Sequence, residues 1–82
     1  MYHSIPTTSR REHSMKLVNR VKELRTAAGM TQKNLADMIG VTVPAVCLWE
    51  SGARNPELEN IFRMTLIFGV TVEDIVQRTE SA

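Results

Sequence analysis

Threonine and glycine divide the middle of this chain into short segments, and this division constrains the fold most strongly. Thr31 precedes "QKNLADMIG", which ends at Gly40, and Thr42 precedes "VPAVCLWESG", which ends at Gly52. A threonine hydroxyl accepts a hydrogen bond from a free N–H at a helix start, and glycine adopts the left-handed conformation that ends many helices. The pattern therefore predicts two short helices joined by a very tight connection.

Apolar residues recur at helical spacing before and after this pair of segments, at Leu17, Val21, Leu24 and Ala28 and again at Leu58, Ile61 and Phe62. We therefore expect a first helix from about Met15 to Ala28 and a fourth from about Glu57 to Phe68. A short fifth helix is expected after Thr71. No segment alternates with period two for long enough to suggest a strand. The expected fold class is all-α, with five short helices.

The 82 residues are enough for one small domain. Residues 1–14 are rich in Ser, Thr, Arg and His without periodicity, so we expect a flexible N-terminal arm. The helical domain is expected over residues 15–78. Residues 79–82 are expected to fray.

Charge is distributed unevenly along the chain, although the formal net charge is only +1. Residues 15–36 carry five cations and one anion, namely Lys16, Arg20, Lys22, Arg25 and Lys33 against Glu23. Residues 57–82 carry two cations and five anions, namely Arg63 and Arg78 against Glu57, Glu59, Glu73, Asp74 and Glu80. The first part of the chain is therefore suited to face a polyanion.

Several classes of protein are disfavoured by composition. No apolar run approaches the length that crosses a bilayer, and residues 1–14 lack the apolar middle of a signal peptide, so we expect a cytoplasmic protein. The single cysteine, Cys47, excludes an internal disulfide and a cysteine-rich zinc site. We expect no metal, cofactor or small-molecule ligand. Neither a Ser/His/Asp set nor a glycine-rich phosphate loop can be assembled, so an enzyme is not expected.

The segment from Thr42 to Ser51 has an unusual outer face. On a helix, Val46, Trp49 and Glu50 lie on one side, whereas Pro44, Leu48 and Ser51 lie opposite at i, i+4 and i+7. Cys47 lies at the margin of that second side. An apolar and nearly uncharged outer face indicates contact with another molecule.

The run from Met30 to Ile75 resembles the Cro/repressor-type, lambda repressor-like helix-turn-helix family. The matching residues are Thr31-Gln32, Leu35-Ala36, Gly40-Val41-Thr42, Val46, Trp49-Glu50, Gly52, Asn55-Pro56 and Gly69-Val70. The resemblance implies a five-helix DNA-binding domain with the helix-turn-helix at its second and third helices. It also implies a small transcriptional regulator, a repressor or Cro-like protein of the kind that phages and prophages carry.

The family's geometry implies that the third helix, Thr42 to Ser51, enters the major groove of double-stranded DNA. Carried over by position, the base-facing residues are Val43, Pro44, Cys47 and Leu48. The phosphate-contacting residues are Thr31, Gln32, Thr42, Ser51, Arg54 and Asn55. Many relatives place polar side chains at the base-facing positions, where a bidentate contact provides about 1–3 kcal/mol of discrimination. Val, Pro and Leu can pack only on thymine methyl groups or leave the readout to DNA shape.

Two further sets of residues have structural or assembly roles. The resemblance implies an internal ion pair between Arg25 and Glu50 that ties the first helix to the third. Apolar residues from Phe62 onwards exceed what five short helices need to bury, which predicts a homodimer through the fifth-helix region: Leu66, Val70, Val72 and Val76. The alternative is a separate protein partner on this surface. The chain would then be an antitoxin-like or adaptor module for which DNA binding is secondary.

Overall fold

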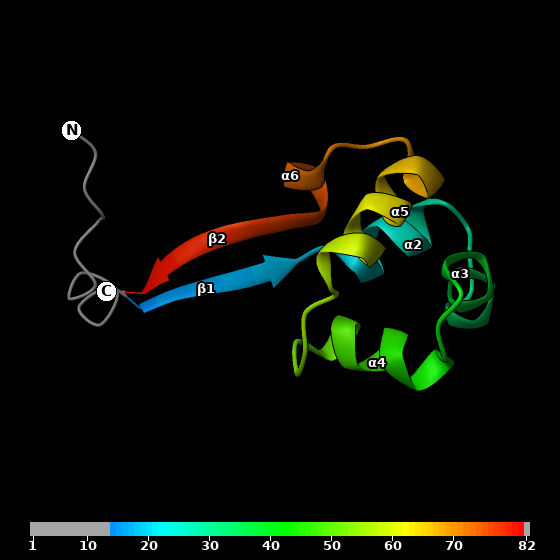
Figure 1. Cartoon of the computed structure of the whole chain (residues 1–82), viewed down its shortest axis with the longest axis horizontal. Helices are drawn as coiled ribbons and strands as arrows, with labels where there is room; N and C mark the ends of the chain where they lie inside the picture. The colour runs from blue at the N-terminus through cyan, green and yellow to red at the C-terminus, as the bar shows by residue number, and fades with distance from the viewer. Residues whose placement is uncertain (1–13, 82) are drawn as a thin grey trace.

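The computed structural model describes residues 14–81, so residues 1–13 of the expected arm and Ala82 lie outside the described part. The order of elements is β1 (Ser14–Asn19), α2 (Val21–Ala27), α3 (Gln32–Ile39), α4 (Val43–Ser51), α5 (Leu58–Phe68), α6 (Val72–Ile75) and β2 (Val76–Ser81). Within residues 14–81 the five expected helices are present, and the mostly helical fold is confirmed (Figure 1).

Two segments differ from the expectation, because the described ends of the chain form a two-stranded antiparallel ribbon. Ser14 lies opposite Ser81, and Asn19 lies opposite Val76. The first helix therefore begins at Val21 rather than near Met15, and residues 79–81 belong to β2 rather than to a frayed end. The ribbon extends away from the helices (Figure 1). The prediction that the chain contains no strand was wrong.

The helix ends follow the capping residues identified in the sequence. The Thr31 hydroxyl accepts a hydrogen bond from the Asn34 N–H, and the Asn34 side chain accepts one from the Thr31 N–H. The Thr42 hydroxyl accepts from the Ala45 N–H. Gly40 has a φ of 92°, a left-handed conformation that ends α3 and leaves only three residues between α3 and α4.

The core draws buried residues from all five helices: Val21, Leu35, Ala36, Ile39, Val46, Trp49, Ile61, Met64 and Ile75. Ala36 is small and buried, which permits close packing of α3 against α4. On α5 the buried residues are Ile61 and Met64. Phe62 is 52% exposed, although it has helical spacing with the apolar residues of this segment.

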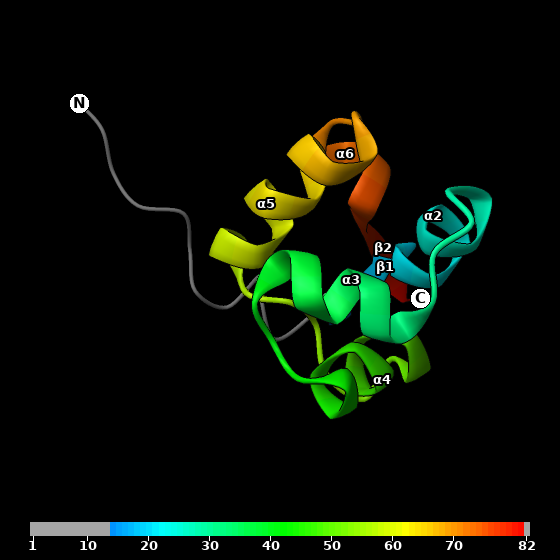
Figure 2. The same cartoon turned by 90° about the vertical axis from the view of Figure 1, so that its right-hand side faces the viewer.

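The arrangement leaves one side of α4 open. Across two perpendicular views α4 lies at the bottom of the molecule and α6 lies near the top (Figures 1 and 2). Among residues 14–81 we find no helix with the length and apolar character needed to span a membrane.

Candidate nucleic-acid interface

The outer face of α4 lies at the surface, as its sequence indicated. Pro44, Cys47 and Ser51 are exposed, and Leu48 is 39% exposed. Val43 is half-buried and packs against the core, so its side chain lies at the edge of this face. We call Pro44, Cys47, Leu48 and Ser51 the outer face of α4. Because Val46 and Trp49 are buried on the opposite side, the core fixes which side of α4 faces outward.

A network of charged and polar side chains holds α4 to α2 and α3. Glu50 accepts hydrogen bonds from both Nε and Nη2 of Arg25, at 2.6 and 3.1 Å. Nη1 of Arg25 donates to the Met30 carbonyl at 2.8 Å. The Gln32 amide donates to the second Glu50 carboxylate oxygen, Oε1, at 2.9 Å. The contact between Arg25 and Glu50 is therefore a fork that involves both carboxylate oxygens.

The environment of Glu50 keeps this carboxylate charged. Its side chain is only 5% exposed, and that of Arg25 is 11% exposed. Burial acts to raise the pKa of Glu50, but hydrogen bonds from Arg25 and Gln32, together with the Arg25 charge, outweigh it and lower the pKa. The hydrogen bond to Glu50 raises the pKa of Arg25. Both partners are ionised near neutral pH, which suits a structural ion pair rather than an acid–base role.

Gln32 lies between α3 and the outer face of α4. Its side-chain oxygen accepts a hydrogen bond from the Cys47 thiol at 3.3 Å, while its amide nitrogen donates to Glu50. The family resemblance predicted that Gln32 contacts a phosphate. The observed contacts are those of a brace. They orient the side chain toward α4.

The other phosphate candidates lie at the starts of α3 and α4 and around the end of α4. Thr31 and Thr42 are exposed at the starts of α3 and α4, where their hydroxyls act as caps. Ser51 is exposed at the end of α4, and its hydroxyl donates to the Leu48 carbonyl. Arg54 is exposed in the following loop, and Asn55 beside it is half-buried.

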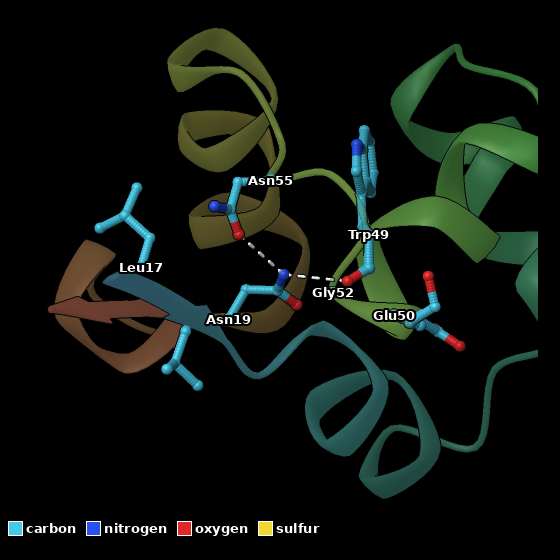
Figure 3. Close-up of a pocket in the computed structure, with 8 residues that line it drawn as sticks. Leu17, Asn19, Trp49, Glu50, Gly52 and Asn55 are labelled. Carbon is cyan, nitrogen blue, oxygen red and sulfur yellow. Dashed lines mark hydrogen bonds between the residues drawn. The ribbon is translucent and has the colours of Figure 1, made fainter. Parts of the chain in front are cut away.

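The sequence did not indicate Asn19, although this residue links four parts of the structure. Its amide nitrogen donates to the Trp49 carbonyl at 3.0 Å and to the Asn55 side-chain oxygen at 3.2 Å (Figure 3). Its oxygen accepts from the Val21 N–H. Asn19 thereby connects the end of β1, the start of α2, the end of α4 and the loop after it. Asparagine is favoured at helix starts, but this signal was hidden while the first helix was expected to begin near Met15.

A groove of about 680 Å³ lies beside Asn19, between the base of the ribbon and the end of α4. The groove is lined by Leu17 and Val18 of β1 and by Trp49, Ser51 and Gly52 at the end of α4. Figure 3 shows Leu17 on the ribbon and Trp49 and Gly52 across from it. The groove is continuous with Ser51, so it borders the outer face of α4.

The fold and this geometry define a helix-turn-helix domain formed by α3 and α4, with the outer face of α4 open. A helix-turn-helix family model matches residues 21–75, from the start of α2 to the end of α6. This chain belongs to that family, which comprises regulators of the Cro/repressor type. It is a family of transcription regulators and not of enzymes.

Three relatives illustrate the similarity. The HTH-type transcriptional regulator DdrOP3 of Deinococcus deserti is 35% identical over 66 residues, which are 80% of this chain and 51% of the relative. The HTH-type transcriptional activator BcrR of Enterococcus faecalis is 30% identical over 66 residues, or 80% of this chain and 32% of the relative. The cryptic phage CTXphi transcriptional repressor RstR of Vibrio cholerae is 25% identical over 63 residues, or 77% of this chain and 57% of the relative. The chain therefore spans about half the length of DdrOP3 and about a third of BcrR.

Proposed function

We propose that this protein binds double-stranded DNA through the outer face of α4 and regulates transcription as a small repressor or Cro-like protein. The observation that carries the proposal is the open outer face of α4 on a helix-turn-helix whose inner side is fixed by the core. The relatives named above are all transcriptional regulators. They favour this function over an antitoxin-like or adaptor module. The proposed place of action is the cytoplasm, and no catalytic role is proposed.

In this proposal the outer face of α4 enters the major groove, and residues at the starts of α3 and α4 and around the end of α4 contact phosphates. Pro44, Cys47 and Leu48 are the proposed base-facing residues, with Val43 at their edge because it is half-buried. Thr31, Gln32, Thr42, Ser51, Arg54 and Asn55 are the proposed phosphate contacts. Arg54 is the one among them with a full positive charge, so it should contribute most to the salt dependence of binding.

Gel shifts on DNA from upstream of the gene, at several salt concentrations, test this function. The logarithm of the affinity should fall linearly with the logarithm of salt concentration, by about 0.9 for each phosphate contacted. Arg54→Gln should reduce this slope by about one, since it removes one phosphate contact. Arg78→Gln removes the same charge from the exposed surface of β2 and should leave the slope unchanged. No shift at any salt concentration would refute the function, and equal slopes for the two variants would refute the role of Arg54.

We further propose a homodimer through α5 and α6, so that two copies of α4 lie about 34 Å apart on a roughly palindromic site. Leu66 is 86% exposed, and Phe62 lies one turn before it on α5. Val70, Val72 and Val76 are half-buried against the protein's own core, so Leu66 and Phe62 would contribute most of the new contact.

Sedimentation of Leu66→Glu tests the dimer, because a charge at the centre of the interface should yield monomers. Met38→Glu is the matched control, since Met38 is also an exposed apolar residue but lies on a different helix, α3. A wild-type monomer at micromolar concentration would refute self-association and leave a different protein as the partner of this surface. A dimeric Leu66→Glu variant would refute the α5 interface. The outer edges of the ribbon would then be the next candidate, since strand edges can pair with another chain.

A further inference from the structure

The half of α4 that would meet base edges contains almost no side chain able to form a hydrogen bond. From Val43 to Leu48 the sequence is Val-Pro-Ala-Val-Cys-Leu, so the Cys47 thiol is the single polar side-chain group. That thiol already donates to Gln32. Direct recognition of a base by a pair of hydrogen bonds requires an amide, guanidinium or carboxylate, and this stretch provides none.

The polar groups that border this stretch are also engaged within the protein. Both Glu50 oxygens accept hydrogen bonds from Arg25, and Gln32 contacts Glu50 and Cys47. The Ser51 hydroxyl donates to the Leu48 carbonyl. The backbone at the start of α4 adds little, because Pro44 has no N–H and the Ala45 N–H is bound by Thr42. The outer face of α4 therefore offers DNA an apolar surface rather than hydrogen-bond donors.

Pro44 and Leu48 form the centre of that apolar surface. They lie one helical turn apart, so their side chains are neighbours on the same face. Both side chains are exposed to water. Moving an apolar side chain out of water lowers the free energy, so contact with another apolar group would be favourable. Among the four bases, only thymine presents an apolar group in the major groove, namely its C5-methyl group. If a guanine or cytosine edge packed against Pro44 and Leu48, its polar groups would lose their hydrogen bonds to water, and these two side chains could not replace them.

From these observations we propose that Pro44 and Leu48 recognise thymine by its methyl group, and that α4 forms no direct side-chain hydrogen bond to a base. This inference rests on the proposed DNA binding and specifies which chemical group is read. Removing one contacted methyl group should weaken binding about fourfold, which is the effect expected when the burial of one methyl or methylene group is lost.

The test uses DNA selected by this 82-residue chain from a random pool. Each thymine in the selected site is replaced singly by deoxyuridine, which lacks the methyl group and keeps every hydrogen-bonding atom. We expect about a fourfold loss of affinity at one or two positions in each half-site and no change elsewhere. Leu48→Ala should abolish the difference between thymine and deoxyuridine at one of these positions, because the methyl group has lost its partner. Met38→Ala removes an exposed apolar side chain from α3, outside the proposed interface, and should retain the difference.

The outcomes separate this inference from the function on which it rests. If the protein binds the selected DNA but no deoxyuridine replacement weakens binding, methyl recognition is refuted and DNA binding stands. If Leu48→Ala retains the full sensitivity at every position, Leu48 is not the reading residue and the proposal is also overturned. If no sequence is enriched and no DNA is bound even at low salt, the proposed function itself fails.

Discussion

Replacing Glu50 with alanine should destabilise this domain severely, because the carboxylate joins three helices. The substitution removes the acceptor of two hydrogen bonds from Arg25 and one from Gln32. The Arg25 guanidinium, only 11% exposed, then keeps the Met30 carbonyl as its partner. Removing one partner of a buried ion pair costs about 3–5 kcal/mol.

We expect a cost near the lower limit, about 3 kcal/mol, because the remaining exposure of Arg25 allows water to replace part of the lost contact. Domains of this length are stable by only a few to about 12 kcal/mol, so the loss is a large fraction of the total. A change of 1 kcal/mol shifts the Tm of a small domain by about 4–8 °C, so the expected decrease in Tm is roughly 12–24 °C.

Thermal melts followed by circular dichroism measure this effect, with Glu59→Ala as the control. Glu59 also pairs with an arginine, Arg63, at 2.8 Å, but its side chain is 72% exposed. Exposed pairs of this kind contribute about 0–1 kcal/mol, so the control should lower the Tm by no more than about 8 °C. Equal effects of the two substitutions would refute the assignment of Glu50 as the clamp between α2 and α4.

Three further predictions concern the same network and the connections around it. Since the pKa of Glu50 is lowered in the folded state, its stabilisation is fully present above its ordinary pKa of 4.5 and is lost as the pH falls through the lowered value. Acid should thus decrease the Tm of the wild type more than that of Glu50→Gln in melts between pH 6 and 3, and parallel decreases would contradict this. Asn19→Ala should cost about 1–3 kcal/mol in urea unfolding, because the Val21 N–H loses its side-chain acceptor and the Trp49 carbonyl keeps only the Gly52 N–H as a donor, and a cost below about 0.5 kcal/mol would count against the linking role. Gly40→Ala should cost about 1–2 kcal/mol from its left-handed backbone alone, since an added Cβ meets no atom within 4 Å, and an unchanged urea midpoint would contradict that reasoning.

The features that depend on a few neighbouring residues were predictable from the sequence. Thr31 and Thr42 mark the starts of α3 and α4, and Gly40 marks the tight connection between them, because capping acts within one helical turn. The inner side of α4 also followed from periodicity, since Val46 and Trp49 are buried. The ion pair between Arg25 and Glu50 was predicted from the family resemblance, and the structure contains it.

The features that depend on distant parts of the chain were not predictable in this way. Leu17 and Val21 have helical spacing, but Leu17 lies in β1 because β1 pairs with β2 at the other end of the domain. Local periodicity cannot detect a pairing between the two ends of a chain. Asn19 was missed for the same reason, since its partners Trp49 and Asn55 lie some thirty residues away.

The central claim is that the outer face of α4 contacts DNA, and the affinity of Leu48→Glu for the selected DNA site tests it most directly. Leu48 is 39% exposed, so the variant should fold with a Tm close to that of the wild type. A carboxylate facing the DNA should raise the Kd by at least about tenfold through like-charge repulsion. Thr79→Glu adds the same charge on exposed β2 and should leave the Kd within about twofold of the wild type. A folded Leu48→Glu variant that binds as tightly as Thr79→Glu would contradict the account.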